Sequence, residues 1–197
     1  MNEFVIINGV LYKYNGNESR VVIPNGVRQI KTKAFDECKK VFKIEIPNSV
    51  ETISSLAFLD CNRLELINIP NNVQYIGFAA FAQMVQVKPQ YNANGSLRAF
   101  KAFSKGWTCR DFQYEIGKSY HQDGEIECCW NGFHTCPNPL MVFNHYWGDV
   151  NDRRFAEVEL SGKMDWEDDK VAASDIKIVR ELFVNDLAEI YNSMEKV

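Results

Sequence analysis

The chain has 197 residues, a formal net charge of −4 and a hydrophobic content of 46%, enough to bury real cores and too much for a disordered chain. The charge is uneven: residues 1–88 carry 10 Lys and Arg against 8 Asp and Glu, whereas residues 89–197 carry 12 against 18. Nucleic-acid affinity depends on neutralising closely spaced phosphates, so an acidic second half disfavours a nucleic-acid partner. The length allows one large domain or two small ones.

The sequence contains no stretch that is long and apolar enough to span a membrane. The N-terminus has neither a cationic leader nor a small-residue cleavage site, unlike a signal peptide. Cys38 and Cys61 lie at equivalent positions of a repeat, where a core residue is expected, and adjacent Cys128 and Cys129 suit a disulfide framework poorly. The pattern therefore favours reduced thiols and a cytoplasmic protein.

Residues 4–14 predict a β-hairpin, because two apolar runs rich in β-forming residues flank Asn8-Gly9, a pair that favours tight primed turns. A stack of repeats has no upstream neighbour for its first unit. We therefore expect this hairpin to act as an N-terminal cap.

One pattern then occurs three times between residues 21 and 84, at a period of 23 residues. The framework positions are Ile23, Pro24, Val27, Ile30, Phe35 and Cys38, then Ile46, Pro47, Val50, Ile53, Phe58 and Cys61, then Ile69, Pro70, Val73, Ile76, Phe81 and Met84. A period of this length indicates stacked supersecondary units.

The residue pattern within each repeat predicts a short strand, the end of that strand and the core residues. The I-x-I tripeptide alternates with period two, so both isoleucines face one side of a short strand, and the following proline ends that strand. An Ala-Phe pair recurs at residues 34–35, 57–58 and 80–81, and its large and small side chains predict a stacked aromatic column. Every framework residue is therefore expected in the core.

The pattern I-x-I-P-x-x-V-x-x-I-x-x-x-A-F-x-x-C resembles the leucine-rich repeats of the bacterial BspA-like class over about residues 1–86. Many members are secreted proteins with long arrays, whereas this chain has three full copies and no export signal. The resemblance implies a protein partner bound on the exposed side of the strands. The residues predicted to face outward there are Arg20, Val22, Lys43, Glu45, Leu66 and Asn68.

Residues 85–97 break the period and read as a linker, so we place domain boundaries at 1–88 and 97–197. The second domain predicts strands and helices without regular alternation, which indicates α+β. The expected strands are Leu97–Phe103, Phe112–Ile116, Phe155–Leu160 and Asp175–Val179, the expected helices are 139–147 and about 183–194, and Asp165–Asp169 is expected as a solvated loop.

Several motifs of the second half occur in one order: K-x-F at residue 101, C-R-x-x-Q-Y at 109, G-F-H-x-C-x-N-P at 132 and E-V-E at 157. This order resembles an uncharacterised domain of bacterial and phage proteins over about residues 98–182. The resemblance implies a bacterial or phage origin and carries no activity.

His134 and Cys136 share a face of a predicted strand, and together with Cys129 and Cys109 they would offer the four thiolate and imidazole ligands that tetrahedral zinc prefers. The chain has no C-x-x-C pair and matches no common zinc spacing, so we expect no cofactor, with zinc as the alternative. A Cys–His nucleophile pair drawn from Cys109 or Cys129 with His134 or His145 also stays open.

Lys101, the G-F-H-T-C strand and Glu157 also weakly resemble the strand order of ADP-ribosyltransferase-type folds, although the usual H-G-T or Arg opening is missing. The aromatic residues near His134 fit either a pocket or a core. The candidate pocket of the second domain comprises Lys101, Trp130, His134, Cys136, His145, Tyr146 and Glu157.

The sequence thus predicts an α+β chain, with a short leucine-rich-repeat β-solenoid of three 23-residue repeats followed by a small α+β domain. The leading functional hypothesis is a non-enzymatic, intracellular protein-binding protein of bacterial or phage type. The competing hypothesis makes the second domain an enzyme or nucleotide-binding unit centred on His134 and targeted by the repeats. The oligomeric state stays open.

Overall fold

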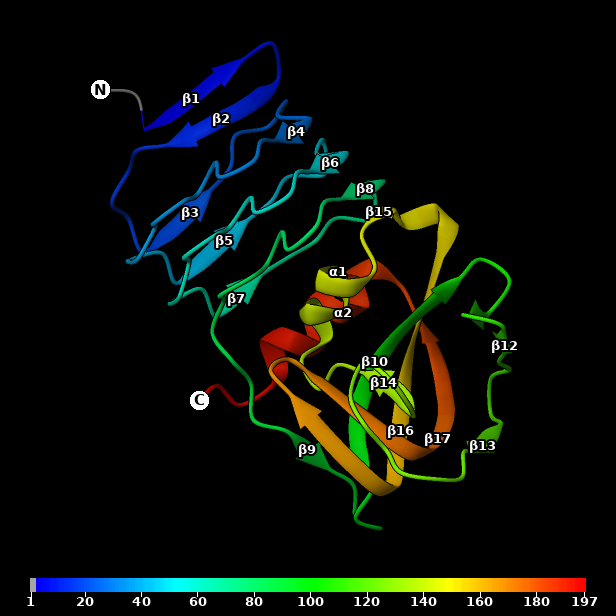
Figure 1. Cartoon of the computed structure of the whole chain (residues 1–197). Coiled ribbons are helices and arrows are strands. Elements are labelled where there is room, and N and C mark those ends of the chain that lie inside the picture. The colour runs from blue at the N-terminus through cyan, green and yellow to red at the C-terminus, as the bar shows by residue number, and fades with distance from the viewer. Residues whose placement is uncertain (1–2) are drawn as a thin grey trace.

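The computed structural model describes residues 3–197 (Figure 1). In the repeat region, strands of successive repeats lie parallel, and each residue pairs with its equivalent 23 positions on: Val21 with Ile44, and Ile44 with Ile67. One sheet contains β3 (Arg20–Val22), β5 (Lys43–Glu45) and β7 (Leu66–Ile67). The other runs β1 (Phe4–Ile7), β2 (Val10–Tyr14), β4 (Gln29–Ile30), β6 (Thr52–Ile53), β8 (Tyr75–Ile76) and β15 (Gly148–Asp149).

The hairpin predicted at residues 4–14 is present as β1 and β2. Its turn places Asn8 and Gly9 at φ values of 51° and 77°, the left-handed geometry that a primed turn requires. Strand β2 then pairs in parallel with β4, Leu11 beside Ile30. The hairpin therefore covers the first repeat.

An aromatic column runs through the centre of the repeats and continues into the second half of the chain. The Phe58 ring stacks between Phe35 and Phe81, with ring centroids 5.3 and 5.6 Å away. Further contacts of 5.1 to 5.7 Å extend the column to Phe4 and Tyr14 on one side and to Phe143 and Phe155 on the other. One core therefore joins the repeats to the second half.

The second half is built on two long antiparallel strands, β16 (Arg153–Glu167) and β17 (Lys170–Leu182), with β10 (Leu97–Ser104) beside β16. Strand β14 (Phe133–Thr135) pairs with β17, and a bridge between Phe100 and Cys136 joins its end to β10. The sheet therefore curls back on itself. The shorter strands are β9 (Gln90–Tyr91), β11 (Thr108–Cys109), β12 (Phe112–Gln113) and β13 (Ser119–His121).

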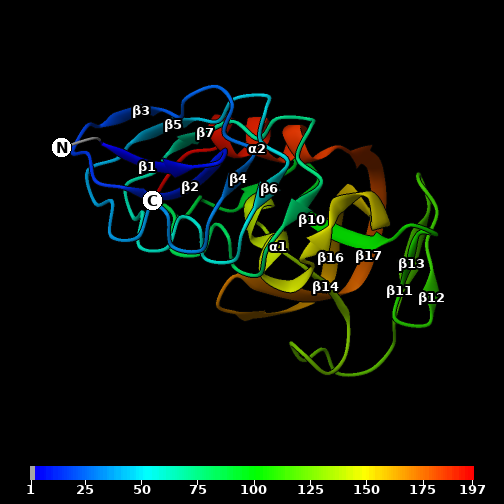
Figure 2. The same cartoon turned by 90° about the horizontal axis from the view of Figure 1, so that it is seen from above.

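The curled sheet separates two cores. Alternate residues of β10 point to opposite faces, so Phe100 joins the core shared with the repeats, whereas Ala99 and Phe103 join a second core inside the curl. Helices α1 (Val142–His145) and α2 (Val184–Ser193) lie between the last repeat and this sheet (Figures 1 and 2).

Helix α2 closes the last repeat through polar contacts as well as apolar ones. The buried Tyr191 hydroxyl donates to the carbonyls of Leu64 and Val85, at 2.8 and 3.0 Å. The Asn192 side chain accepts from the Ile67 N–H at 3.0 Å and donates to the Ile67 carbonyl at 2.9 Å. This amide occupies the edge of β7 as another strand would.

Some elements differ from the sequence prediction. The loop predicted at Asp165–Asp169 is correct only for residues 168 and 169, which form the turn of a hairpin. Asp165 to Glu167 end β16 and pair with the start of β17, so their backbone groups are satisfied by a hairpin partner despite the acidic composition. The strand predicted at Phe112–Ile116 covers only Phe112–Gln113, because Tyr114 is fixed by aromatic packing against Phe103 and Tyr120. Other differences are of extent: β16 and β17 are longer than predicted, helix 139–147 is a 3-10 turn (Pro139–Met141) followed by α1, and the linker contains β9.

A second 3-10 turn, Val150–Asp152, leads into β16. Among residues 3–197, no helix is long and apolar enough to cross a membrane.

Replacing Phe58 with Ala should lower the free energy of unfolding by roughly 3 to 5 kcal/mol, because it empties the middle of the aromatic column. All four tryptophans lie beyond residue 100, so tryptophan fluorescence reports on the second half of the chain. In denaturant titrations, the unfolding midpoint measured by tryptophan fluorescence and the midpoint measured by far-UV circular dichroism should fall by the same amount. The exposed Tyr91→Ala is the control, with a change within about 0.5 kcal/mol. An unchanged fluorescence midpoint in Phe58→Ala would show that the two halves unfold independently.

Candidate functional site

The strand face of the repeat region, formed by β3, β5 and β7, is hollowed into a groove of about 830 Å³. Five of the six predicted face residues line it, namely Val22, Lys43, Glu45, Leu66 and Asn68. The sixth, Arg20, is exposed on the same strand as Val22. Between them the inward residues Val21, Ile44 and Ile67 are buried.

The groove combines an apolar surface with paired charges. Val22 is 63% exposed, a large value for an aliphatic side chain. Lys43 and Glu45 form an ion pair of 2.6 Å on one strand. The Asn68 side chain is occupied, because its amide pairs with the Ile46 N–H and carbonyl at 2.7 and 2.8 Å.

In the second half, five of the seven predicted pocket residues line one cavity of about 350 Å³: Lys101, His134, Cys136, His145 and Tyr146. A smaller cavity of about 220 Å³ shares Lys101, His134 and Tyr146 with it and has Trp130 on its wall. The G-F-H-T-C-P-N-P motif explains part of this arrangement. Strand β14 carries His134, and the Asn138 side chain accepts from the Leu140 N–H at 3.1 Å, where the turn leading into α1 begins.

Glu157 lies apart from this cavity. It pairs with Phe100 in the β10–β16 ladder, whereas Lys101 pairs with Ala156, so the side chains of Glu157 and Lys101 point to opposite faces of the sheet. Arg98 and Arg180 hold the Glu157 carboxylate at 2.7 Å each. Burial opposes ionisation of Glu157, but hydrogen bonds from Arg98 and Arg180 lower its pKa.

Lys101 is buried inside the curl, and its Nζ donates to the His134 carbonyl at 2.8 Å. Its ammonium also lies 5.7 Å from the Phe103 ring and 5.9 Å from the Tyr114 ring. Burial lowers the pKa of Lys101. A lower pKa increases the fraction of Lys101 that is in the neutral amine form, which is the nucleophilic form of lysine.

The His134 imidazole is half-buried, and its Nε2 accepts a hydrogen bond from the Cys129 N–H at 2.8 Å. This contact requires the neutral ring with its proton on Nδ1. Burial lowers the pKa of His134, and the nearby charge of Lys101 adds to the effect.

The remaining cavity residues are engaged with neighbours. His145 Nε2 lies 3.0 Å from Asp169 Oδ1. Burial alone would raise the pKa of Asp169, but the hydrogen bonds from His145 and Asn144 outweigh burial and lower that pKa. The Tyr146 hydroxyl lies 3.3 Å from Cys109 Sγ. Cys136 is buried, which raises the pKa of its thiol.

The described chain offers no assembled metal site: within residues 3–197, no group of three His, Cys, Asp or Glu is placed to hold an ion. The Nε2 of His134 is occupied by the Cys129 N–H, and Cys136 faces the shared core. All six cysteines are free thiols.

Sequence reasoning missed Arg110 and Lys170, which also line the larger cavity. Arg110 stands in the C-R-x-x-Q-Y motif, which could have drawn attention to it. Lys170 follows the acidic segment Asp165–Asp169, which the sequence predicts as a loop. Lys170 reaches the cavity only because it lies at the start of β17.

Comparison with known proteins agrees with this architecture. The family described as BspA type leucine rich repeat region matches residues 5–104, just over half of the chain, and a domain of unknown function (DUF7666) matches residues 97–190. The chain thus belongs to the BspA-type leucine-rich-repeat family and carries in its second half this domain of unknown function. Leucine-rich repeats generally mediate protein–protein interaction.

Among solved structures, the chain is similar to a leucine-rich repeat protein from Bacteroides ovatus, with 32% sequence identity and a TM-score of 0.33. The match covers 40% of this chain and 24% of that protein, so the chain spans about a quarter of its length. No curated protein matches the chain.

Acid should destabilise the protein partly through His134. The unfolded imidazole takes up a proton near pH 6.5, whereas the folded one does so only at lower pH, so the unfolded state binds more protons below that value and stability is lost there. His134→Gln should remove this contribution. Urea unfolding at about pH 7 and about pH 5 should therefore show a larger loss for the wild type than for His134→Gln. Equal losses in the two proteins would contradict the assigned neutral ring.

Proposed function

We propose that the strand face of β3, β5 and β7 binds a protein partner, and that the chain is a non-enzymatic docking protein of bacterial or phage type that works inside the cell. In this proposal the repeats form a short solenoid, and the second domain closes its last repeat. The observation that carries the proposal is the groove, because residues from all three repeats line it. Six free thiols support the intracellular setting.

The chemistry of the groove suits a protein segment. Val22 and Leu66 offer apolar contact, and burial of such area is the main favourable contribution to association. The neighbouring charges are of both signs, with Arg20 and Lys43 beside Glu45. A row of phosphates would meet the Glu45 carboxylate, so a polypeptide with apolar and mixed polar side chains is the better match.

The two sides of this strand face differ. At β7 the Asn192 amide occupies the edge, whereas among the described residues no strand pairs with the outer edge of β3. An unpaired strand edge can accept an added strand from another chain. The partner is therefore expected to approach the groove from the β3 side, which is also the side of Val22, the exposed aliphatic side chain of the groove.

Replacing Val22 with Glu should weaken partner binding about tenfold or more, because the interface would bury an unpaired carboxylate. The matched control is Ile7→Glu, which places the same charge at another exposed aliphatic residue, 56% accessible, on a strand of the other sheet. Partners recovered from the native host with wild-type protein would be titrated against both variants. Equal losses of binding affinity in Val22→Glu and Ile7→Glu would contradict the assignment of partner binding to this face.

Charge reversal at the Lys43–Glu45 pair tests the same face without touching the core. Lys43→Glu and Glu45→Lys should each weaken binding several-fold, because each leaves two like charges side by side in the groove. The double exchange restores the pair and should recover part of the affinity, measured by calorimetric titration. No change in any of the three variants would contradict a partner at this groove.

The competing function, an enzyme or nucleotide-binding unit around His134, has one observation in its favour: the cavity that collects Lys101, His134 and Tyr146. His134→Ala separates the two hypotheses in the native host. Docking predicts that biological activity survives this variant and is lost on reversal of Lys43 and Glu45. The opposite result would favour the enzyme.

A further inference from the structure

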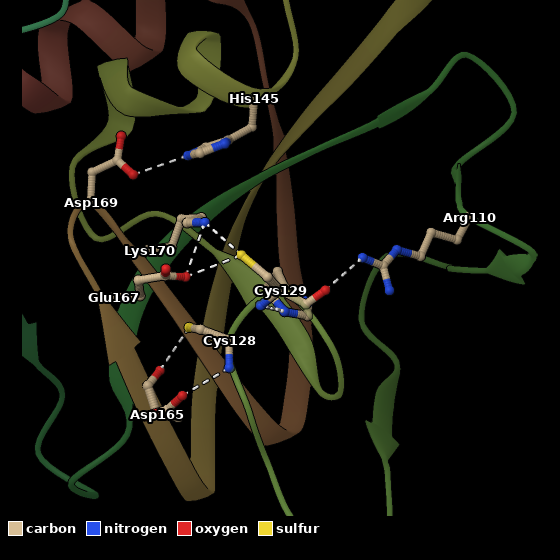
Figure 3. A network of polar contacts seen from close by, with 9 residues as sticks. Arg110, Cys128, Cys129, His145, Asp165, Glu167, Asp169 and Lys170 are labelled. Carbon is tan, nitrogen blue, oxygen red and sulfur yellow. Dashed lines mark hydrogen bonds and ion pairs between the residues drawn. The ribbon is translucent and has the colours of Figure 1, made fainter.

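Cys129 occupies an unusual position at the rim of the larger cavity. Its φ of 71° is in the left-handed region, which is uncommon for a residue with a side chain. Two contacts hold this backbone. Its N–H donates to His134 Nε2 at 2.8 Å. Its carbonyl accepts from Arg110 at 3.5 Å, as Figure 3 shows. The thiol is thereby directed at the tip of the β16–β17 hairpin.

Two charged groups of that hairpin meet the sulfur. Cys129 Sγ lies 2.9 Å from Lys170 Nζ and 3.1 Å from Glu167 Oε2, and Lys170 lies 3.4 Å from Glu167 (Figure 3). A carboxylate at this distance can accept the thiol proton, and an ammonium can stabilise the thiolate that remains. The contact with Cys129 is also the largest cause of the raised pKa of Lys170.

The adjacent cysteine provides an internal comparison. Cys128 is buried, its Sγ donates to the Asp165 carbonyl at 3.2 Å, and burial raises the pKa of its thiol. Cys129 is exposed and has a cation and a base on its sulfur. Two neighbouring residues of the same type therefore lie in opposite environments.

The cavity beside Cys129 favours reactions that develop negative charge. Its lining includes three basic side chains, Lys101, Arg110 and Lys170, and no carboxylate, although the second half of the chain is acidic overall. A small polar oxidant can enter a space of about 350 Å³ and meet the sulfur from this side.

We propose that Cys129 is a redox modification site, where a hydroperoxide oxidises the thiol and Lys170 then captures the product as a covalent Cys129–Lys170 cross-link. The proposal does not depend on partner binding at the repeats. It assigns separate roles to the three groups: Cys129 is the nucleophile, Glu167 accepts its proton, and Lys170 first stabilises the thiolate and later attacks the oxidised sulfur.

In the first step the sulfur attacks one oxygen of hydrogen peroxide. An S–O bond forms and the O–O bond breaks, sulfur loses two electrons to the peroxide, and the departing hydroxide takes the thiol proton from Glu167 and leaves as water. The product is the sulfenic acid of Cys129.

In the second step the Lys170 amine attacks the sulfenic sulfur, which lies within contact distance before oxidation. An N–S bond forms, the S–O bond breaks, the oxygen leaves as water, and the amine gives up one proton. Sulfenic acids condense with nitrogen in this way to give sulfenamides. Before the attack, the Lys170 ammonium passes one proton to Glu167, which is a carboxylate again after the first step and lies 3.4 Å away.

The net result is the loss of two hydrogen atoms and the formation of a covalent bond between the loop that carries Cys129 and the start of β17. A cross-link there would hold the rim of the cavity against the hairpin. Reduction by a thiol would break the N–S bond and restore both side chains.

The test is peptide-level mass spectrometry of the full chain after brief exposure to hydrogen peroxide, with and without dimedone, which traps sulfenic acids. Wild-type protein should give a linked peptide joining Cys129 to Lys170, lighter by two hydrogen atoms and released by dithiothreitol. Lys170→Met keeps the aliphatic stem but not the amine. It should react more slowly and accumulate the dimedone adduct at Cys129 instead of the cross-link.

Two further variants complete the design. Cys129→Ser should abolish the linked peptide, whereas Cys128→Ser should leave it unchanged. The proposal is overturned if hydrogen peroxide consumes the free Cys129 thiol no faster than the free Cys128 thiol in the wild type. It is equally overturned if the wild type accumulates the dimedone adduct to the same extent as Lys170→Met, because Lys170 would then not capture the sulfenic acid.

Discussion

The structure depends on the stacking of phenylalanine rings along one axis. Each repeat contributes one ring, and Phe35, Phe58 and Phe81 lie in contact at 5.3 and 5.6 Å. Because the column continues to Phe143 of α1, the second half is packed onto the repeats through the same core. A single repeat could not bury its apolar face alone, so each unit is stable only beside its neighbours.

This packing leaves the strand face of β3, β5 and β7 free for a partner. Inward residues such as Ile44 are committed to the core, and the alternating residues on the same strands are left to the groove. Helix α2 sets the limit of that face, because Asn192 occupies the last strand edge. The docking proposal follows from this division between the buried and the available side of each strand.

The second half is not built from stacked repeats. Its core is enclosed by a sheet that curls until β14 lies between β17 and β10. The curl buries Lys101 and places His134 on the cavity wall. It also brings Cys129 against the β16–β17 hairpin, 41 residues away from Lys170 in sequence. The proposed oxidation of Cys129 depends on this contact and does not involve the repeats.

The sequence by itself determined the 23-residue repeat, the inward and outward residues of its strands, the N-terminal hairpin and the aromatic column through the repeats, because these follow from local periodicity. Five of the seven pocket residues that it grouped do line one cavity, and four of these five lie close together along the chain, between His134 and Tyr146. Only the tertiary structure decided that Glu157 faces away, that Asp165 to Glu167 belong to a strand, and that Lys170 meets Cys129. Strand register and hairpin length fix those contacts, and both arise from pairing between distant segments that composition does not encode.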